Sequence, residues 1–136
     1  MTTRPAWMSG GLVVVVTVLA SLTVYALTLA PSLTWSHWGG DGGDFVTSAV
    51  TGRVPHPPGF PLYLLLSRIG VRFVGGDPAH VLNGLSALMA ALTAGLTALA
   101  CTKRTRSGWA GMTAGLSLAF APLFWSQALI TEVYSS

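Results

Sequence analysis

Three long stretches without a charged residue constrain this chain more than any other feature of its sequence. They run over Leu12–Ala30, Val81–Thr102 and Ser107–Thr131. A helix needs about 20 mainly apolar residues to cross the hydrocarbon core of a bilayer, and each stretch is near or above that length. Only 8% of the residues are charged, whereas soluble domains carry about 25%. The sequence therefore predicts an all-α integral membrane protein with about three transmembrane helices, at about 11–30, 81–102 and 107–125.

The first stretch has a rival interpretation as a cleaved signal peptide. The apolar region of a signal peptide is normally about 7–15 residues long and ends at a small-x-small site. Here the uncharged run is longer, and Pro31 directly follows Ala30, which is unfavourable for cleavage. A retained membrane span is therefore expected.

A more polar loop, at about 31–80, separates the first two predicted spans. Four of its glycines, Gly39, Gly40, Gly42 and Gly43, lie close together and predict a break in any helix there. Further on, Pro61–Phe73 repeats apolar residues at helical spacing and carries Arg68 and Arg72 on another face. Because this segment is too short and too charged to cross a bilayer, it predicts an amphipathic helix lying in the membrane interface.

The distribution of basic residues predicts the orientation of the chain in the membrane. Arg4 precedes the first span, and a basic cluster at 103–106 lies between the second and third. With three spans, these two segments share one side, which the excess of positive charge on cytoplasmic loops identifies as the cytoplasm. The N-terminus is then cytoplasmic, and the loop at 31–80 and Glu132 lie together on the extracytoplasmic side.

Asp41 and Asp44 are the candidate catalytic residues. The chain has four acidic residues, and these two lie three apart with glycines between them. A carboxylate beside apolar surface can have its pKa raised and then act as a general base toward a hydroxyl acceptor, and such a pair can also bind a divalent cation. The alternative is a solvated Gly/Asp turn, which is common.

Four further residues are candidates for substrate binding. His56, in His-Pro-Pro-Gly, can contact a phosphate or an acceptor, or belong to a rigid turn with an exposed ring. Arg68 and Arg72 can contact the phosphates of a lipid-linked donor, or extend their charged ends to ordinary headgroups. Glu132 can bind an acceptor, or be a plain charge at a helix end.

Several classes of function are not supported by the sequence. The formal net charge is only +3 and the basic residues form no stripe, so no nucleic-acid partner is expected. Cys101 is the single cysteine, which excludes a disulfide framework and a cysteine-based metal site. No Asp, Glu, Lys, Arg or His lies within the predicted spans, where a transporter would often place an ionisable group. No metal ligand set is predicted, and a divalent metal requirement stays open.

The order of the motifs resembles the N-terminal region of the transmembrane protein 260-like family of protein O-mannosyltransferases, which belongs to the GT-C class of multi-pass glycosyltransferases. The motifs are Pro31-Ser-Leu-Thr-Trp, Asp41-Gly-Gly-Asp, His56-Pro-Pro-Gly-Phe-Pro-Leu, Asn83-Gly-Leu-Ser-Ala, Ala121-Pro-Leu-Phe-Trp-Ser-Gln and Thr131-Glu-Val-Tyr. The resemblance covers most of the chain, from about Leu29 to Tyr134. It implies that residues 1–136 are the N-terminal part of a GT-C-like transmembrane domain in a longer protein.

The resemblance also implies an activity. A mannose-like sugar passes from a polyprenyl- or dolichyl-phosphate carrier, the co-substrate, to a hydroxyl acceptor on a protein or glycan, with inversion at the sugar carbon. The acceptor is expected to be protein Ser or Thr on the extracytoplasmic side, with membrane lipid as a further partner. GT-C enzymes place an essential carboxylate in the first large extracytoplasmic loop, which implies Asp41 or Asp44 as the base. The family pattern is more often Asp-x-Gly-Glu, so Asp44 stands where Glu is usual.

Two functions from different classes remain open at this point. The first is the glycosyltransferase, for which the sequence favours a bacterial plasma membrane over the endoplasmic reticulum. The alternative is a non-catalytic membrane subunit, or a truncated remnant, that binds a partner through the loop carrying Asp41 and Asp44.

Overall fold

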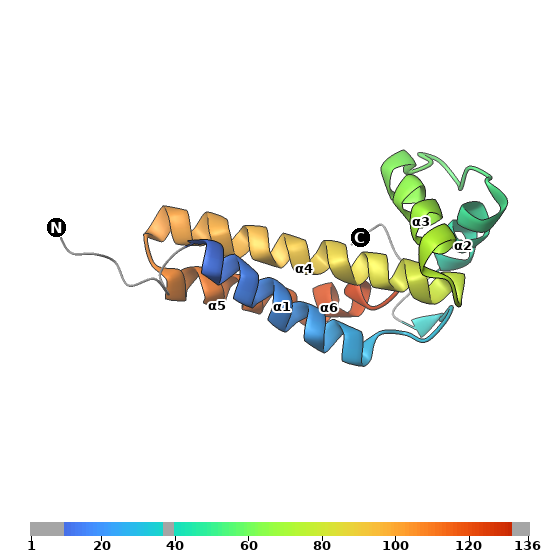
Figure 1. Ribbon diagram of the computed structural model, residues 1–136. Helices are drawn as coiled ribbons and strands as arrows, with labels where there is room; N and C mark the ends of the chain where they lie inside the picture. The colour runs from blue at the N-terminus through green and yellow to red at the C-terminus, as the bar shows by residue number, and fades with distance from the viewer. Residues whose placement is uncertain (1–9, 37–39, 132–136) are drawn as a thin grey trace.

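The computed structural model describes residues 10–36 and 40–131, and every regular element in these ranges is a helix (Figure 1). The helices are α1 (Gly10–Thr28), α2 (Gly42–Thr51), α3 (Pro61–Val74), α4 (Pro78–Thr105), α5 (Gly108–Ala119) and α6 (Pro122–Ala128). α1 and α5 pack against α4 and against each other, and α2 and α3 gather at the end of the bundle where α4 begins. The predicted all-α class is confirmed.

Two of the described helices, α1 and α4, are long and apolar enough to cross a membrane. Their burial pattern is the reverse of the pattern in a soluble bundle. On α1 the buried positions recur every four residues and include Thr17, Ser21 and Tyr25, whereas Leu19 is 59% exposed and Leu27 is 81% exposed. Small and hydroxyl residues inside, with large apolar residues outside, are typical of helices that pack within lipid.

The third predicted span, at 107–125, differs from the expectation, because the structure divides it into two helices. α5 has 12 residues and is therefore only about 18 Å long, while α6 has seven. The division lies before Pro122, which has no amide hydrogen and disfavours helical backbone at the preceding residue. Ala121 is accordingly extended, with ψ of 129°. The hydroxyl of buried Tyr25 donates to the carbonyl of Ala119, at the end of α5, at 2.8 Å.

α4 and α5 pack closely because small residues line their interface. Ala94 and Ala98 are fully buried on α4, and they face Gly111 and Gly115 of α5. A methyl group added at Gly115 would lie 2.8 Å from both the carbonyl oxygen of Ala94 and the side chain of Ala98. Small side chains at these positions therefore allow the two helices to approach closely.

α2 corrects the prediction that the glycines around the two aspartates exclude a helix. Gly42 and Gly43 are the first two residues of α2. The poor helix propensity of glycine is outweighed by tertiary burial, since Phe45 is fully buried against the neighbouring helix α3 and Ala49 is 7% exposed. The predicted helix at Pro61–Phe73 is confirmed as α3, and Gly75, at φ 72°, ends it.

The basic cluster lies at the other end of the bundle from α2 and α3. Lys103 and Arg104 occupy the last turn of α4, and Arg106 follows it in the left-handed conformation. In Figure 1 this turn lies at the left, and α2 and α3 lie at the right. The two polar ends of the bundle are thus separated along its length, one basic and one carrying the predicted site.

Candidate functional site

The start of α2 places both candidate carboxylates. Asp41 is the residue before the helix, and its carbonyl accepts the backbone N–H groups of Asp44 and Phe45 at 3.0 and 3.1 Å. The Asp41 side chain makes no capping bond to α2, so its carboxylate is not used by the helix end. Asp44 lies in the first turn, where the positive end of the helix dipole favours an anion.

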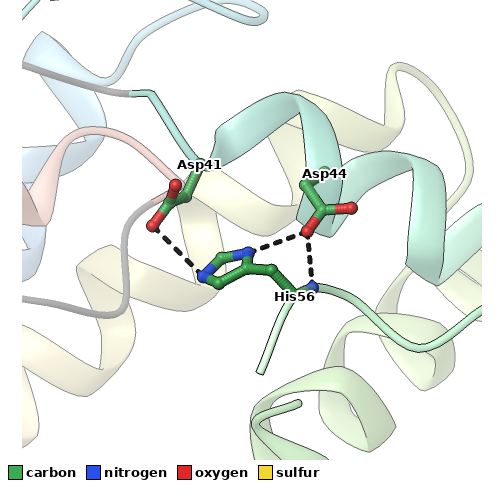
Figure 2. Close-up of polar contacts among 3 residues, drawn as sticks. All are labelled: Asp41, Asp44 and His56. Carbon is green, nitrogen blue, oxygen red and sulfur yellow. Dashed lines mark hydrogen bonds and ion pairs between the residues drawn. The ribbon is translucent and has the colours of Figure 1, made fainter. Parts of the chain in front are cut away.

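His56 lies between the two carboxylates (Figure 2). Its Nδ1 is 2.8 Å from Oδ2 of Asp44, and its backbone N–H donates to the same oxygen at 2.8 Å. Its Nε2 is 3.6 Å from Oδ2 of Asp41. The three side chains are 36–44% exposed. The Asp41–His56–Asp44 cluster is therefore a pre-formed, solvent-accessible arrangement in which each ring nitrogen faces a carboxylate.

The turn after His56 and an aromatic group behind it hold the imidazole. The N–H of Gly59 donates to the carbonyl of His56 at 3.0 Å, and Gly59 has a φ of 84°, which suits glycine. The imidazole lies 5.6 Å from the ring of Phe45 and 5.9 Å from that of Phe60. Phe45 also contacts Tyr63 of α3, at 5.4 Å between ring centres. The imidazole therefore has an apolar wall on one side and carboxylates on its polar edge.

The pKa of Asp44 moves in the opposite direction to the sequence expectation. The backbone N–H of His56 holds the pKa of Asp44 below its usual value, and the bond from the His56 ring lowers it further. Asp44 is therefore ionised at neutral pH. An ionised carboxylate only accepts hydrogen bonds. Nδ1 of His56 is therefore the protonated ring nitrogen, and its N–H donates a hydrogen bond to Asp44. This bond fixes the orientation of the ring.

The lowered pKa of Asp44 predicts a pH dependence of stability. The pKa is lower in the folded state than the ordinary value of 3.8, so the contact stabilises the fold above pH 3.8 and is lost as the pH falls below that value. We expect Asp44→Asn to melt at a lower temperature than wild type at pH 6. The difference should shrink between pH 4 and pH 3. Melting in detergent across this range checks it, and a difference independent of pH contradicts it.

The two arginines predicted to bind substrate both lie on α3 but differ in their contacts. Nη2 of Arg68 donates to the carbonyl of Arg53 at 2.7 Å, and its buried Nε has no partner among the described residues. Arg68 therefore ties α3 to the segment that leads into His56. Arg72 is exposed in the last turn of α3, and its contact with a phosphate stays a prediction.

Glu132 lies outside the described residues, so its predicted role in acceptor binding stays a prediction. The residue before it is described. A methyl group added at Gly42 would lie 3.4 Å from the carbonyl oxygen of Thr131, so the chain at Thr131 lies beside the start of α2. The predicted convergence of these distant segments is thus observed as far as Thr131.

Sequence reasoning did not give Phe45 or Asn83 a place in the site. Phe45 lies four residues after Asp41, one helical turn on, but the expected helix break hid that spacing. Asn83 is 2% exposed on α4 and bonds to the chain on both sides of the site. A lone amide in an otherwise apolar span was the available signal, since an amide there needs a partner. Within residues 10–36 and 40–131, no group of three His, Cys, Asp or Glu side chains is placed to hold a metal ion.

Comparisons of the sequence with known proteins identify a family. The profile described as the Protein O-mannosyl-transferase TMEM260 N-terminal domain matches residues 41–136. Protein O-mannosyl-transferase TMEM260 of Mus musculus is 36% identical over 131 residues, covering 95% of this chain and 18% of the relative. Protein O-mannosyl-transferase tmem260 of Dictyostelium discoideum is 25% identical over 125 residues, covering 90% and 15% respectively. No solved structure matches.

Apolar helices with a carboxylate–imidazole cluster at one end define a membrane-type helical domain with a polar site at the end of its helix bundle. The matched profile covers more than half of the chain, so the chain belongs to the TMEM260 family of protein O-mannosyl-transferases, in its N-terminal domain. It spans less than a fifth of the length of these curated relatives. Both relatives are eukaryotic, and the bacterial plasma membrane stays a prediction.

Proposed function

We propose that this chain carries the base of a membrane glycosyltransferase. The enzyme transfers a mannose-like sugar from a polyprenyl- or dolichyl-phosphate carrier to a hydroxyl group, that of protein Ser or Thr, on the extracytoplasmic side. One observation carries the proposal: both aspartates of the first loop converge on one imidazole at the end of the apolar bundle. The names of the relatives support the reaction class.

The geometry favours Asp41 over Asp44 as the base. Asp44 already accepts two hydrogen bonds from His56, and its lowered pKa makes it the weaker proton acceptor. Among the described residues, Asp41 has the 3.6 Å approach to Nε2 of His56 as its only ion-pair contact. A hydroxyl oxygen can lie about 2.8 Å from both atoms. Asp41 can therefore accept the hydrogen of an acceptor hydroxyl that lies against the His56 ring, and Asp44 orients that ring.

The transfer step needs no reactant besides the lipid-linked sugar and the acceptor hydroxyl. The acceptor oxygen forms a bond to the sugar carbon that carries the phosphate, and its proton passes to Asp41. The bond from that carbon to the phosphate oxygen breaks, and the electron pair leaves with the lipid phosphate. Attack opposite to the leaving group inverts the sugar carbon. A phosphate leaves as an anion, so the site needs one base and nearby positive charge, for which Arg72 is the exposed candidate on α3.

Gene deletion and complementation test this function in the cell. Deletion should remove O-linked hexose from secreted proteins. The wild-type full-length gene should restore it, and a gene with Asp41→Asn should not. If Asp41→Asn restores the glycan fully, Asp41 is not the base. If Asp44→Asn also restores it fully, the chain acts as a subunit that presents the loop to a partner.

The outward face of α3 supports a position at the membrane surface. Leu62, Leu65, Ile69 and Phe73 are 46–79% exposed, and they share one side of the helix, while Leu64 and Ser67 are buried against the bundle. The predicted apolar face of this helix is therefore its outer face. We propose that it rests in the lipid interface. An open cavity of about 400 Å³ between α3 and α4, lined mainly by apolar residues, gives a lipid carrier a place to lie.

Spin labelling tests the position of α3. A label on Phe73→Cys, in a Cys101→Ala background, should be more accessible to oxygen and less accessible to a water-soluble nickel complex than a label on Thr51→Cys. Residue 51 is exposed at the end of α2 and serves as the control. Equal accessibility at both positions in bilayers contradicts the interfacial placement.

A further inference from the structure

A buried asparagine on α4 joins two segments that are far apart in the sequence. Asn83 is 2% exposed. Its Nδ2 donates to the carbonyls of Ala30 and Ser32, at 3.0 and 3.3 Å. Its Oδ1 accepts the hydroxyl of Thr131 at 2.7 Å, and Thr131 is 3% exposed. The amide donor thus bonds to the start of the first loop, and the amide acceptor bonds to the segment after α6.

Neighbouring contacts join the same two segments. Nδ1 of His80, one turn before Asn83 on α4, lies 3.2 Å from the carbonyl of Ala30. The backbone N–H of Ala30 donates directly to the carbonyl of Leu129 at 3.2 Å. The hydroxyl of Ser32 bonds to the carboxylate of Asp77, which also caps α4. The first turns of α4 therefore hydrogen-bond to residues 30–32, and residues 129–131 bond to the same part of the structure.

These contacts reach the catalytic end of α2 through Gly42. A methyl group added at Gly42 would lie 3.4 Å from the side chain of Leu33, and 3.4 and 3.6 Å from the carbonyl oxygen and Cβ of Thr131. Gly42 is buried between these two residues. Leu33 directly follows the segment that Asn83 holds, and Thr131 is itself a partner of Asn83. Gly42, the residue next to Asp41, is therefore packed between two segments whose positions are set by hydrogen bonds to Asn83.

We propose that Asn83 and Thr131 form a latch that sets the position of the Asp41 end of α2. Both are positioning residues, because they act on Asp41 through Gly42 and touch none of the reacting atoms. The effect of the latch on sugar transfer rests on the proposed function, whereas its effect on α2 does not. The latch also explains how a polar amide is accommodated in an apolar helix, because both its donor and its acceptor have partners.

Hydrogen exchange of the full-length protein in detergent tests the latch without an activity assay. Thr131→Val keeps the shape of the side chain and removes the donor to Asn83. We expect peptides that cover residues 40–45 to exchange about tenfold faster, as the loss of one buried hydrogen bond predicts. Thr131→Ser should restore wild-type exchange. The matched control is Thr93→Val on α4, because the exposed Thr93 hydroxyl bonds only to the carbonyl of Met89 in its own helix.

The transfer assay tests the consequence for catalysis. Thr131→Val should lower kcat about tenfold with little change in the KM for the donor, and Thr131→Ser should recover it. Unchanged exchange at residues 40–45 overturns the latch. Faster exchange with an unchanged kcat overturns the positioning role. If wild-type protein transfers no sugar, the proposed function fails, and the exchange experiment still decides the latch.

Discussion

Asp41→Asn in the full-length protein is expected to lower kcat for sugar transfer by about 100- to 10,000-fold, the usual contribution of a general base. Asparagine has nearly the same shape but cannot take the proton from an acceptor hydroxyl. The side chain makes no capping bond to α2, so the amount of folded protein in the membrane should not change. Initial rates at saturating donor and acceptor, with protein amounts matched by quantitative blotting, measure the effect.

Asp44→Asn is the matched comparison, because it removes the same charge from the same helix turn. Its carboxylate orients His56 through the backbone N–H and the ring, which both bond to Oδ2. An asparagine oxygen in the place of Oδ2 can still accept these bonds, but without the negative charge. We expect a loss of about tenfold, well below that of Asp41→Asn. The reverse order of the two losses would assign the base to Asp44, and wild-type rates in both variants would remove the cluster from catalysis.

Gly111→Leu is expected to prevent normal packing of α5 on α4. A methyl group at this position would overlap the hydroxyl of Thr102 and lie 2.5 Å from the carbonyl oxygen of Ala98. A backbone carbonyl cannot move aside as a flexible side chain does, so the two helices must separate. Overpacking of this kind costs about 3 kcal/mol. Thermal melting in detergent should show a large decrease in the midpoint, or no folded peak on size exclusion.

The control for Gly111→Leu is Gly11→Leu, in the first turn of α1. A methyl group at Gly11 meets nothing within 4 Å among the described residues, and this position is exposed. The same substitution should therefore leave melting close to wild type. Equal destabilisation by both variants would show that the α4–α5 contact is not the source of the effect.

Much of the fold was predictable because it depends on local patterns. Uncharged length predicted α1 at Leu12–Ala30, and the structure places it at Gly10–Thr28. Helical spacing predicted α3 to within one residue of its end. Pro122 is a local signal of the same kind, because a proline disfavours helical backbone at the residue before it, and α5 ends just before it. The length of the third uncharged stretch alone did not predict its division into α5 and α6.

The parts that the sequence did not predict depend on tertiary contacts. α2 forms in spite of Gly42 and Gly43 because burial of Phe45 outweighs local propensity. The bond between His56 and Asp44 joins residues 12 apart, a separation with no helical period behind it. The pKa of Asp44 is lowered first by the backbone N–H of His56 and then by its ring, so apolar surroundings alone gave the wrong sign. The sequence indicated which residues belong to the site, but their contacts with one another became visible only in the folded structure.

The most direct test of the account is sugar transfer by the purified full-length protein with defined substrates. It should be incubated with polyprenyl-phosphate mannose and a Ser/Thr-containing peptide, and the product examined by mass spectrometry and NMR. We expect one hexose on a hydroxyl oxygen, with the anomeric configuration opposite to that of the donor. Absence of transfer, retention of configuration, or equal use of a nucleotide-linked sugar in place of the lipid carrier would contradict it.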